Sequence, residues 1–206
     1  MFYFVRTPKW LQQLYKSCIW KMPTNEKVIY LTFDDGPHPA ATNFVLDILN
    51  TYHAKGTFFC IGKNVMAHPE IYNRIIAEGH AVGNHTYNHL NGWKTNTEAY
   101  VTNIMEASKC IATKLFRPPY GRITTPQLKR LPGIGLKPIM WTVLSGDFDT
   151  GISNQTCLQN VLTKTTNGSI VVFHDSEKAY LKLAYTLPKV LDYFIERGYR
   201  FEKIEL

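Results

Sequence analysis

Short apolar runs alternate with amphipathic stretches along most of this chain. The apolar runs are rich in β-branched and aromatic residues, whereas the stretches between them carry apolar residues at helical spacing. This alternation predicts a parallel sheet, either open or closed as a barrel. We expect strands at Val28–Phe33, Thr57–Ile61, His80–Gly83, near Phe116, at Pro138–Trp141, Ser169–Phe173 and Arg200–Ile204. We expect helices at Asn43–Tyr52, Ile71–Glu78, Thr97–Leu115, Thr125–Leu131, Cys157–Thr165 and Leu187–Arg197.

Length and composition fit one folded unit. The chain has 206 residues, of which 45% are hydrophobic, and can therefore bury a sizeable core. No repeat of solenoid length, low-complexity run or Pro/Ser/Gly-rich linker divides it. We expect one domain over residues 23–206, preceded by a separate segment of residues 1–22.

Residues 1–22 combine aromatic and basic side chains. Their apolar runs are interrupted by Arg6, Pro8, Lys9 and Lys16, and are too short for a secretory signal or a spanning helix. The segment either packs across the base of the fold or lies on a membrane interface. Lacking a clear signal peptide or transmembrane segment, the sequence leaves a cytoplasmic and an envelope-associated location open.

Two adjacent carboxylates, Asp34 and Asp35, follow the apolar run Val28–Phe33 and precede Gly36-Pro37. The run is typical of a strand buried on both faces, and Gly-Pro ends it sharply. At the carboxyl ends of parallel strands, loops carry ligands and catalytic groups on a rigid scaffold. The pair therefore indicates a functional site, against the alternative of an acidic turn that caps the next helix.

Two histidines, His85 and His89, lie four residues apart after another apolar run. Neutral imidazole is a common zinc ligand, and this spacing lets two rings reach one ion. Asp35 can supply a third, charged ligand, which gives a two-histidine, one-carboxylate set with open metal positions. The alternative is a pair of loop or helix-capping histidines.

The distribution of charge and the spacing of the cysteines argue against a nucleic-acid-binding protein and against a cysteine-based metal site. The formal net charge of +7 comes from 23 Lys and Arg against 16 Asp and Glu, and favours an anionic glycan or membrane surface as partner. The basic residues are dispersed and form no cluster with aromatics, so we expect no nucleic-acid partner. The four cysteines have no Cys-x-x-Cys spacing, which indicates scattered thiols.

Five motifs occur in a recognisable order. Together they resemble the polysaccharide deacetylases with a NodB homology domain, carbohydrate esterase family four, from about Val28 to the C-terminus. The motifs are Thr32-Phe33-Asp34-Asp35, His85-Thr-Tyr-Asn-His89, Arg117-Pro118-Pro119-Tyr120-Gly121, Trp141-Thr-Val-Leu-Ser-Gly-Asp147-Phe148 and Ile170-Val-Val-Phe-His174-Asp175.

The resemblance implies an α/β fold, an irregular (β/α) barrel of about seven parallel strands with the motifs on strand-end loops around one mouth. It implies a metal-dependent hydrolase of linear amides that removes N-acetyl groups from an oligo- or polysaccharide, chitin-like or peptidoglycan-like. One divalent ion, zinc first and cobalt or nickel as alternatives, would sit on Asp35, His85 and His89.

The remaining roles also come from the resemblance. Asp34 would be the general base, oriented by Arg117. His174 would be the general acid, held or tuned by Asp147. The backbone amide of Tyr120 would join the metal in holding the oxyanion. The alternatives for these residues are a loop histidine, a surface ion pair and a turn aspartate.

The fourth motif departs from the family pattern, which often has an aspartate at Leu144 and a tryptophan at Phe148. Phe148 keeps an apolar wall but lacks the indole N–H, so the grip on substrate is expected to differ. Three other functions stay open: an O-acetyl glycan esterase, a glycan-binding relic with a structural metal, and a glycoside hydrolase using Asp34 and another acid. Four aromatic residues could stack on sugar faces or simply pack in the core: Tyr87, Trp93, Tyr120 and Trp141.

Overall fold

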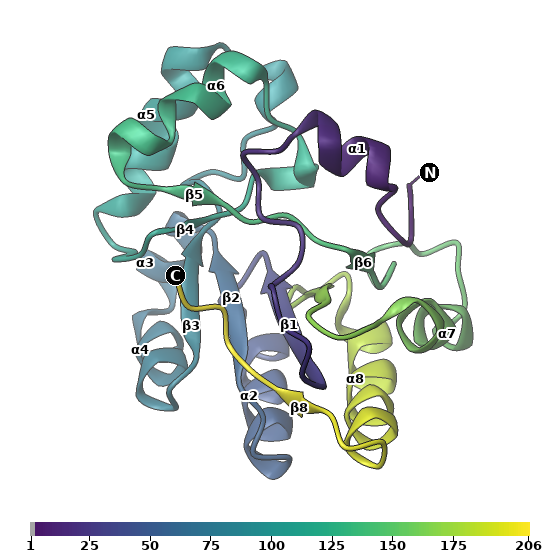
Figure 1. Cartoon of the computed structure of the whole chain (residues 1–206). Coiled ribbons are helices and arrows are strands. Elements are labelled where there is room, and N and C mark those ends of the chain that lie inside the picture. Colours follow the sequence, from purple (N-terminus) through teal and green to yellow (C-terminus); the bar gives the residue numbers. More distant parts are fainter. Residues whose placement is uncertain (1–2) are drawn as a thin grey trace.

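The computed structural model describes residues 3–206, and its centre is one sheet of parallel strands (Figure 1). The hydrogen-bonded order is β5-β4-β3-β2-β1-β7-β6, and β8 pairs with the start of β1. Every pairing between these strands is parallel, so the expected irregular barrel of about seven parallel strands is confirmed. The strands are β1 Val28–Asp34, β2 Gly56–Cys60, β3 Ala81–Asn84, β4 Leu115–Phe116, β5 Lys137–Pro138, β6 Val143–Leu144, β7 Ile170–His174 and β8 Arg200–Phe201.

The two outermost strands of this order, β5 and β6, are consecutive in the chain, so residues 139–142 connect the two edges of the sheet. We expected one strand at Pro138–Trp141, and this prediction was wrong. The chain changes partner along this stretch: the amide of Ile139 donates to β4, and that of Thr142 donates to β7. Two short strands result because neither neighbour stays in register for long.

Residues 5–7 and Ile19 pair with this connection and the strand residues at its ends, and Lys21 pairs with Ser169. The amide of Leu144 donates to Val5, the amide of Thr7 donates to Thr142, and the amide of Met140 donates to Ile19, over 2.8 to 3.0 Å. Helix α1, Lys9–Leu14, lies between these two pairings in the chain and above the connection that leads to β6 in Figure 1. These bonds satisfy backbone groups that an open sheet edge would leave unpaired.

Helices line the outside of the sheet, with α2, α4 and α8 on one side and α5 and α6 together at one end (Figure 1). The helices after α1 are α2 Ala41–Thr51, α3 Gly62–Ala67, α4 Pro69–Ala77, α5 Thr97–Ser108, α6 Thr125–Arg130, α7 Asn154–Lys164 and α8 Tyr180–Ile195. Three 3₁₀ turns are η1 Gly92–Lys94, η2 Pro119–Gly121 and η3 Pro132–Ile134.

Two expected helices have different ends. Helix α5 ends at Ser108, not Leu115, because Thr113 donates to the carbonyl of Val82 and steers the chain into β4. Helix α8 begins at Tyr180, seven residues before the expected start, and contains Pro188 in its interior. Burial of Leu183 and Leu187 against the sheet outweighs the hydrogen bond that Pro188 cannot donate.

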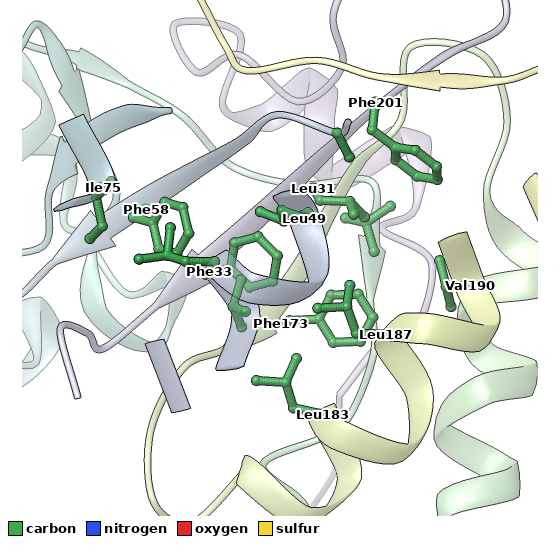
Figure 2. Close-up of a cluster of buried hydrophobic side chains, with 14 of the residues drawn as sticks. Leu31, Phe33, Leu49, Phe58, Ile75, Phe173, Leu183, Leu187, Val190 and Phe201 are labelled. Carbon is green, nitrogen blue, oxygen red and sulfur yellow. The ribbon is translucent and has the colours of Figure 1, made fainter. Parts of the chain in front are cut away.

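The main core lies between the sheet and α2, α4 and α8 (Figure 2). Phe33 of β1 stacks on Phe58 of β2 and on Phe173 of β7, with ring centroids 5.0 and 6.2 Å apart. Leu183 and Leu187 of α8 pack on the same aromatic cluster. This core fixes β1, β2 and β7 rigidly, and β1 and β7 end at the expected catalytic residues Asp34 and His174.

No helix among residues 3–206 has the length and apolar character needed to cross a membrane.

Candidate active site

In the turn after β1, the second of the two adjacent aspartates has a left-handed backbone conformation. Asp34 is the last residue of β1, and Asp35 follows with φ of 82°. Such a conformation is costly for a residue other than glycine and persists where surrounding bonds enforce it. Here Asn64 of α3 donates to the Asp35 carbonyl over 2.8 Å. Two carboxylates adjacent in sequence thus take different surroundings.

The next turn of the chain is anchored by a buried aspartate, Asp175. Its carboxylate accepts from the amide of Gly36 over 3.0 Å and from the hydroxyl of Thr42 over 2.5 Å. A Cβ on Gly36 would lie 2.0 Å from the Asp175 carboxylate, so only glycine permits this approach. Burial raises the pKa of Asp175 to about 8, and the nearby charge of Asp35 also raises it. The hydrogen bonds that Asp175 accepts act in the opposite direction.

Asp34 pairs with a fully buried arginine. Nη1 of Arg117 donates to Asp34 Oδ1 and to the hydroxyl of Thr32, each over 2.7 Å. The guanidinium also donates to the carbonyls of Ile139 and Met140, and its carbon lies 4.0 Å from the ring centroid of Phe59. A buried charge needs such complete pairing. Arg117 therefore fixes one oxygen of Asp34.

The histidine pair meets Asp35 across the mouth of the sheet. Nε2 of His89 lies 3.1 Å from Asp35 Oδ1, and Nε2 of His85 lies 3.7 Å from the same oxygen. Nδ1 of His85 lies 2.7 Å from the carbonyl of Arg117, which can only accept, so Nδ1 carries the proton. Burial lowers the pKa of His85 to about 4, which keeps its Nε2 lone pair available.

These three residues fit a divalent metal ion. One candidate donor atom from each lies within 4.8 Å of the others. Asp35 Oδ1 is buried and has no hydrogen-bond partner among the described residues, a costly arrangement that a cation would relieve. Although burial raises the pKa of Asp35, the close approach of the His89 ring and the charges of the nearby histidines hold that pKa well below its usual range. The set of one carboxylate and two imidazoles is typical of metal sites with open positions.

The loop that carries the histidines is braced from α5. The Asn103 side chain accepts from the amides of Tyr87 and Asn88, each over 3.0 Å. The Thr86 hydroxyl accepts from the amide of Leu90, which closes the loop around His89. Thr86 and His89 both have positive φ, 64° and 56°. The bracing sustains a strained loop that turns both imidazoles towards Asp35.

A second imidazole–carboxylate pair faces the turn from β7. Nδ1 of His174 lies 2.8 Å from Asp147 Oδ1, and the amide of His174 donates to Asp147 Oδ2 over 2.7 Å. Burial alone would lower the pKa of His174. The charge and hydrogen bond of Asp147, followed by the charges of Asp35 and Asp34, outweigh burial and raise that pKa to about 10. These interactions favour the imidazolium form of His174, which can donate a proton.

Tyr120 offers a backbone donor at the same mouth. It lies in η2 with φ of 60°, and among the described residues its N–H donates to no protein group. Its ring centroid lies 4.6 Å from that of His89, and the residue is 58% exposed. A free N–H beside a candidate metal ligand is suited to an oxygen that gains negative charge.

Residues near the N-terminus pack beside His174 at the candidate active site. The Phe148 ring lies between those of Tyr3 and His174, with centroids 5.2 and 5.1 Å away. Leu144, the other departure from the family pattern, is buried, and its amide donates to Val5. Residues 3–7 thus support the loop that carries Asp147.

The structure brings all eight residues singled out from the sequence to the carboxyl ends of the strands and the loops that follow them. The sequence analysis gave no role to four residues that position this set: Thr32, Asn64, Asn103 and Asp175. Thr32 and Asp175 lie within the quoted motifs, whereas Asn64 and Asn103 had no local signal. The four cysteines are free thiols, as expected from their spacing.

Known proteins are similar to this chain in sequence. Residues 21–139 match the family described as polysaccharide deacetylase. A peptidoglycan-N-acetylglucosamine deacetylase of Bacillus cereus is 34% identical over 188 residues, which cover 88% of each chain. A chitooligosaccharide deacetylase of Azorhizobium caulinodans is 36% identical over 163 residues, which cover 75% of this chain and 77% of the relative.

Solved structures agree with the sequence matches. The crystal structure of a peptidoglycan N-acetylglucosamine deacetylase, in complex with 4-naphthalen-1-yl-N-oxidanyl-benzamide, superposes with a TM-score of 0.87 at 32% identity. That match covers 96% of this chain and 95% of the other. The superposition spans nearly the whole of both molecules, so the shared fold includes more than the motif loops.

Proposed function

We propose that this chain, which belongs to the polysaccharide deacetylase family, hydrolyses N-acetyl groups on an oligo- or polysaccharide with the aid of one divalent metal ion. The family resemblance drawn from the five motifs is confirmed by these comparisons, as are the fold and the enzyme class. The observation that carries the proposal is the cluster of Asp35, His85 and His89, with an unpaired buried oxygen on Asp35. We assign the catalytic domain to residues 23–206 and a separate N-terminal segment to residues 1–22, whose residues 5–7 and 19–21 pair with the sheet.

In this proposal Asp35, His85 and His89 hold the metal, and zinc is the first choice, with cobalt or nickel able to use the same ligands. When bound, the ion supplies Lewis-acid chemistry: it lowers the pKa of water towards about 7 and polarises an acetyl carbonyl. Asp34 takes up a proton from the attacking water. Its Oδ1 accepts from Arg117, so Oδ2 is the oxygen left for this proton.

Two further groups complete the reaction. The Tyr120 N–H donates to the carbonyl oxygen as negative charge develops on it. His174 donates a proton to the departing amine, which is a poor leaving group when unprotonated. Asp147 holds the protonated ring through Nδ1 and leaves Nε2 to face the substrate. The proposed base is thus the Asp34 carboxylate, which Arg117 holds, and the proposed acid is the His174 imidazolium, which Asp147 holds.

The alternatives explain less of the geometry. A glycoside hydrolase would need two carboxylates flanking a glycosidic bond, yet Asp35 lies 3.1 Å from His89 and Asp147 lies 2.8 Å from His174. A glycan-binding relic would not need a protonated His174 or a base held by a buried arginine. An O-acetyl esterase would use the same groups, and only substrates distinguish it.

Replacing Asp147 by asparagine is expected to move the alkaline limb of the pH–rate profile to lower pH. Asp147 raises the pKa of His174, so without its charge the imidazolium loses its proton at lower pH. The same raised pKa adds folding stability that is full below about pH 6.5 and is lost as pH rises through about 10. The measurements are kcat/KM against pH, and metal content and thermal unfolding at pH 7 as controls. An unmoved limb would remove His174 as the group behind it.

A substrate panel tests the proposed function. Chitin oligomers, peptidoglycan glycan strands and acetylated xylan are incubated with the metal-loaded protein, and acetate and new reducing ends are both measured. We expect acetate from the N-acetyl glycans without new reducing ends. Acetate released from xylan alone would indicate an O-acetyl esterase. New reducing ends without acetate would indicate a glycoside hydrolase, and binding without turnover would indicate a glycan-binding relic.

A further inference from the structure

An anchored, exposed tryptophan lies next to the candidate active site. Trp93 of η1 is 61% exposed, although large aromatic side chains are usually buried. Its indole N–H donates to the carbonyl of Ile123 over 3.3 Å, and its amide donates to the Asn91 side chain over 3.0 Å. Gln127 fastens the same turn by donating to the carbonyls of Gly92 and Thr95. The exposed ring is therefore held in one place.

An arginine with no acidic partner lies over this ring. The guanidinium carbon of Arg122 is 5.1 Å from the ring centroid of Trp93. Within residues 3–206, no carboxylate lies within 4.0 Å of Arg122, whereas Arg74, Arg130 and Arg200 each form at least one ion pair. Arg122 covers one face of the indole and leaves Trp93 exposed elsewhere. We call these two side chains the Trp93–Arg122 platform.

The platform continues the candidate active site along the same two loops. His89 contacts Tyr120 across these loops with ring centroids 4.6 Å apart, and Trp93 contacts Arg122 in the same way further along. Tyr120 precedes Arg122 by two residues, a stretch of chain that spans at most about 7 Å. The platform therefore follows His89 along one loop and Tyr120 along the other, within a few residues of the candidate metal ligands.

We infer that the Trp93–Arg122 platform binds the sugar next to the one being deacetylated, and that this sugar carries a carboxylate on a substituent. The exposed indole offers a flat apolar surface to a pyranose ring. The free guanidinium donates charge-assisted hydrogen bonds to a carboxylate. This inference rests on the proposed function, and it selects acidic, peptidoglycan-like strands over neutral, chitin-like ones as the preferred substrate.

The test compares three tetrasaccharides as substrates of the metal-loaded protein. One is a peptide-free peptidoglycan tetrasaccharide, whose alternate sugars carry a lactyl carboxylate. The second is the same compound with each carboxyl reduced to an alcohol, and the third is neutral chitotetraose. We expect kcat/KM to be about tenfold higher for the acidic compound than for its reduced form, as one charge-assisted hydrogen bond would give.

Substitutions locate the effect. In Arg122→Gln we expect the ratio of kcat/KM between the acidic and reduced compounds to fall towards one, mainly through KM. Arg197→Gln is the matched control, because Arg197 also stacks on an aromatic ring, that of Tyr193. It should leave the ratio unchanged. Trp93→Ala should lower kcat/KM about tenfold on all three compounds, whereas Trp10→Ala, at a comparably exposed tryptophan of α1, should not.

The outcomes separate this inference from the proposed function. Acetate release with equal kcat/KM on acidic and reduced compounds, or an Arg122→Gln variant that keeps the wild-type ratio, would overturn the inference and leave the deacetylase intact. No acetate from any tetrasaccharide would overturn the proposed function as well. A tetrasaccharide that still carries its peptide shows whether the carboxylate lies on the sugar or on the attached peptide.

Discussion

Replacing Asp35, His85 or His89 by alanine is expected to remove most of the bound metal and nearly all deacetylase activity. Each supplies one of the three donor atoms that lie within 4.8 Å of one another, and the remaining two would bind an ion weakly. Among the three, Asp35 alone would bring a negative charge to the ion, because imidazoles bind metals as neutral ligands. Elemental analysis of the purified variants, with acetate release measured in parallel, checks the prediction.

Controls for this prediction exist within the chain. Asp47→Ala removes a carboxylate that pairs with Arg74 on the surface and should keep full metal content. Cys110→Ser, at a half-buried free thiol, should also keep it. An Asp35→Ala variant with full stoichiometric metal would defeat the ligand assignment, and loss of metal in the cysteine variant would point to a different site.

Asp34→Asn is expected to lower kcat by on the order of 10²–10⁴ while leaving metal content unchanged. Asparagine keeps an oxygen that can accept from Arg117 but cannot take up a proton. The substitution also leaves the Arg117 guanidinium buried without its counter-charge, so a lower unfolding temperature is expected. The measurements are kcat, metal content and thermal unfolding of the same preparation.

Two outcomes would contradict the role of Asp34. Loss of the metal in Asp34→Asn would mean that Asp34 and Asp35 have exchanged roles. A wild-type kcat would show that the proton goes elsewhere. Asp47→Asn, which removes the charge of a surface aspartate, is the control for a general effect of charge on turnover.

The sequence predicts the parts of this fold where one local pattern decides the structure. The run from Val28 to Phe33 is mostly β-branched and aromatic, as expected of a strand buried on both faces, and β1 ends at Asp34. The motif residues follow such strands, so their meeting at one mouth follows from parallel pairing. Residues 139–142 were less predictable, because their backbone bonds go to three different segments.

The supporting residues of the site could not be predicted for the same physical reason. Asp175 accepts from Gly36 across 139 positions of sequence, and Asn64 reaches the Asp35 carbonyl across 29. Neither bond leaves a local pattern of hydrophobicity, spacing or turn type. The pairing of residues 5–7 and 19–21 with the sheet is equally long in range and is visible only in the folded chain.

The most direct measurement of metal-dependent N-deacetylation is a time course of acetate and free amine released from an N-acetylglucosamine oligomer, before and after the metal is removed with a chelator. For a metal-dependent N-deacetylase we expect one amine per acetate, loss of both products after chelation, and recovery when one equivalent of zinc is returned. Acetate release that continues at the same rate in metal-free protein, or acetate without matching amine, would contradict this expectation.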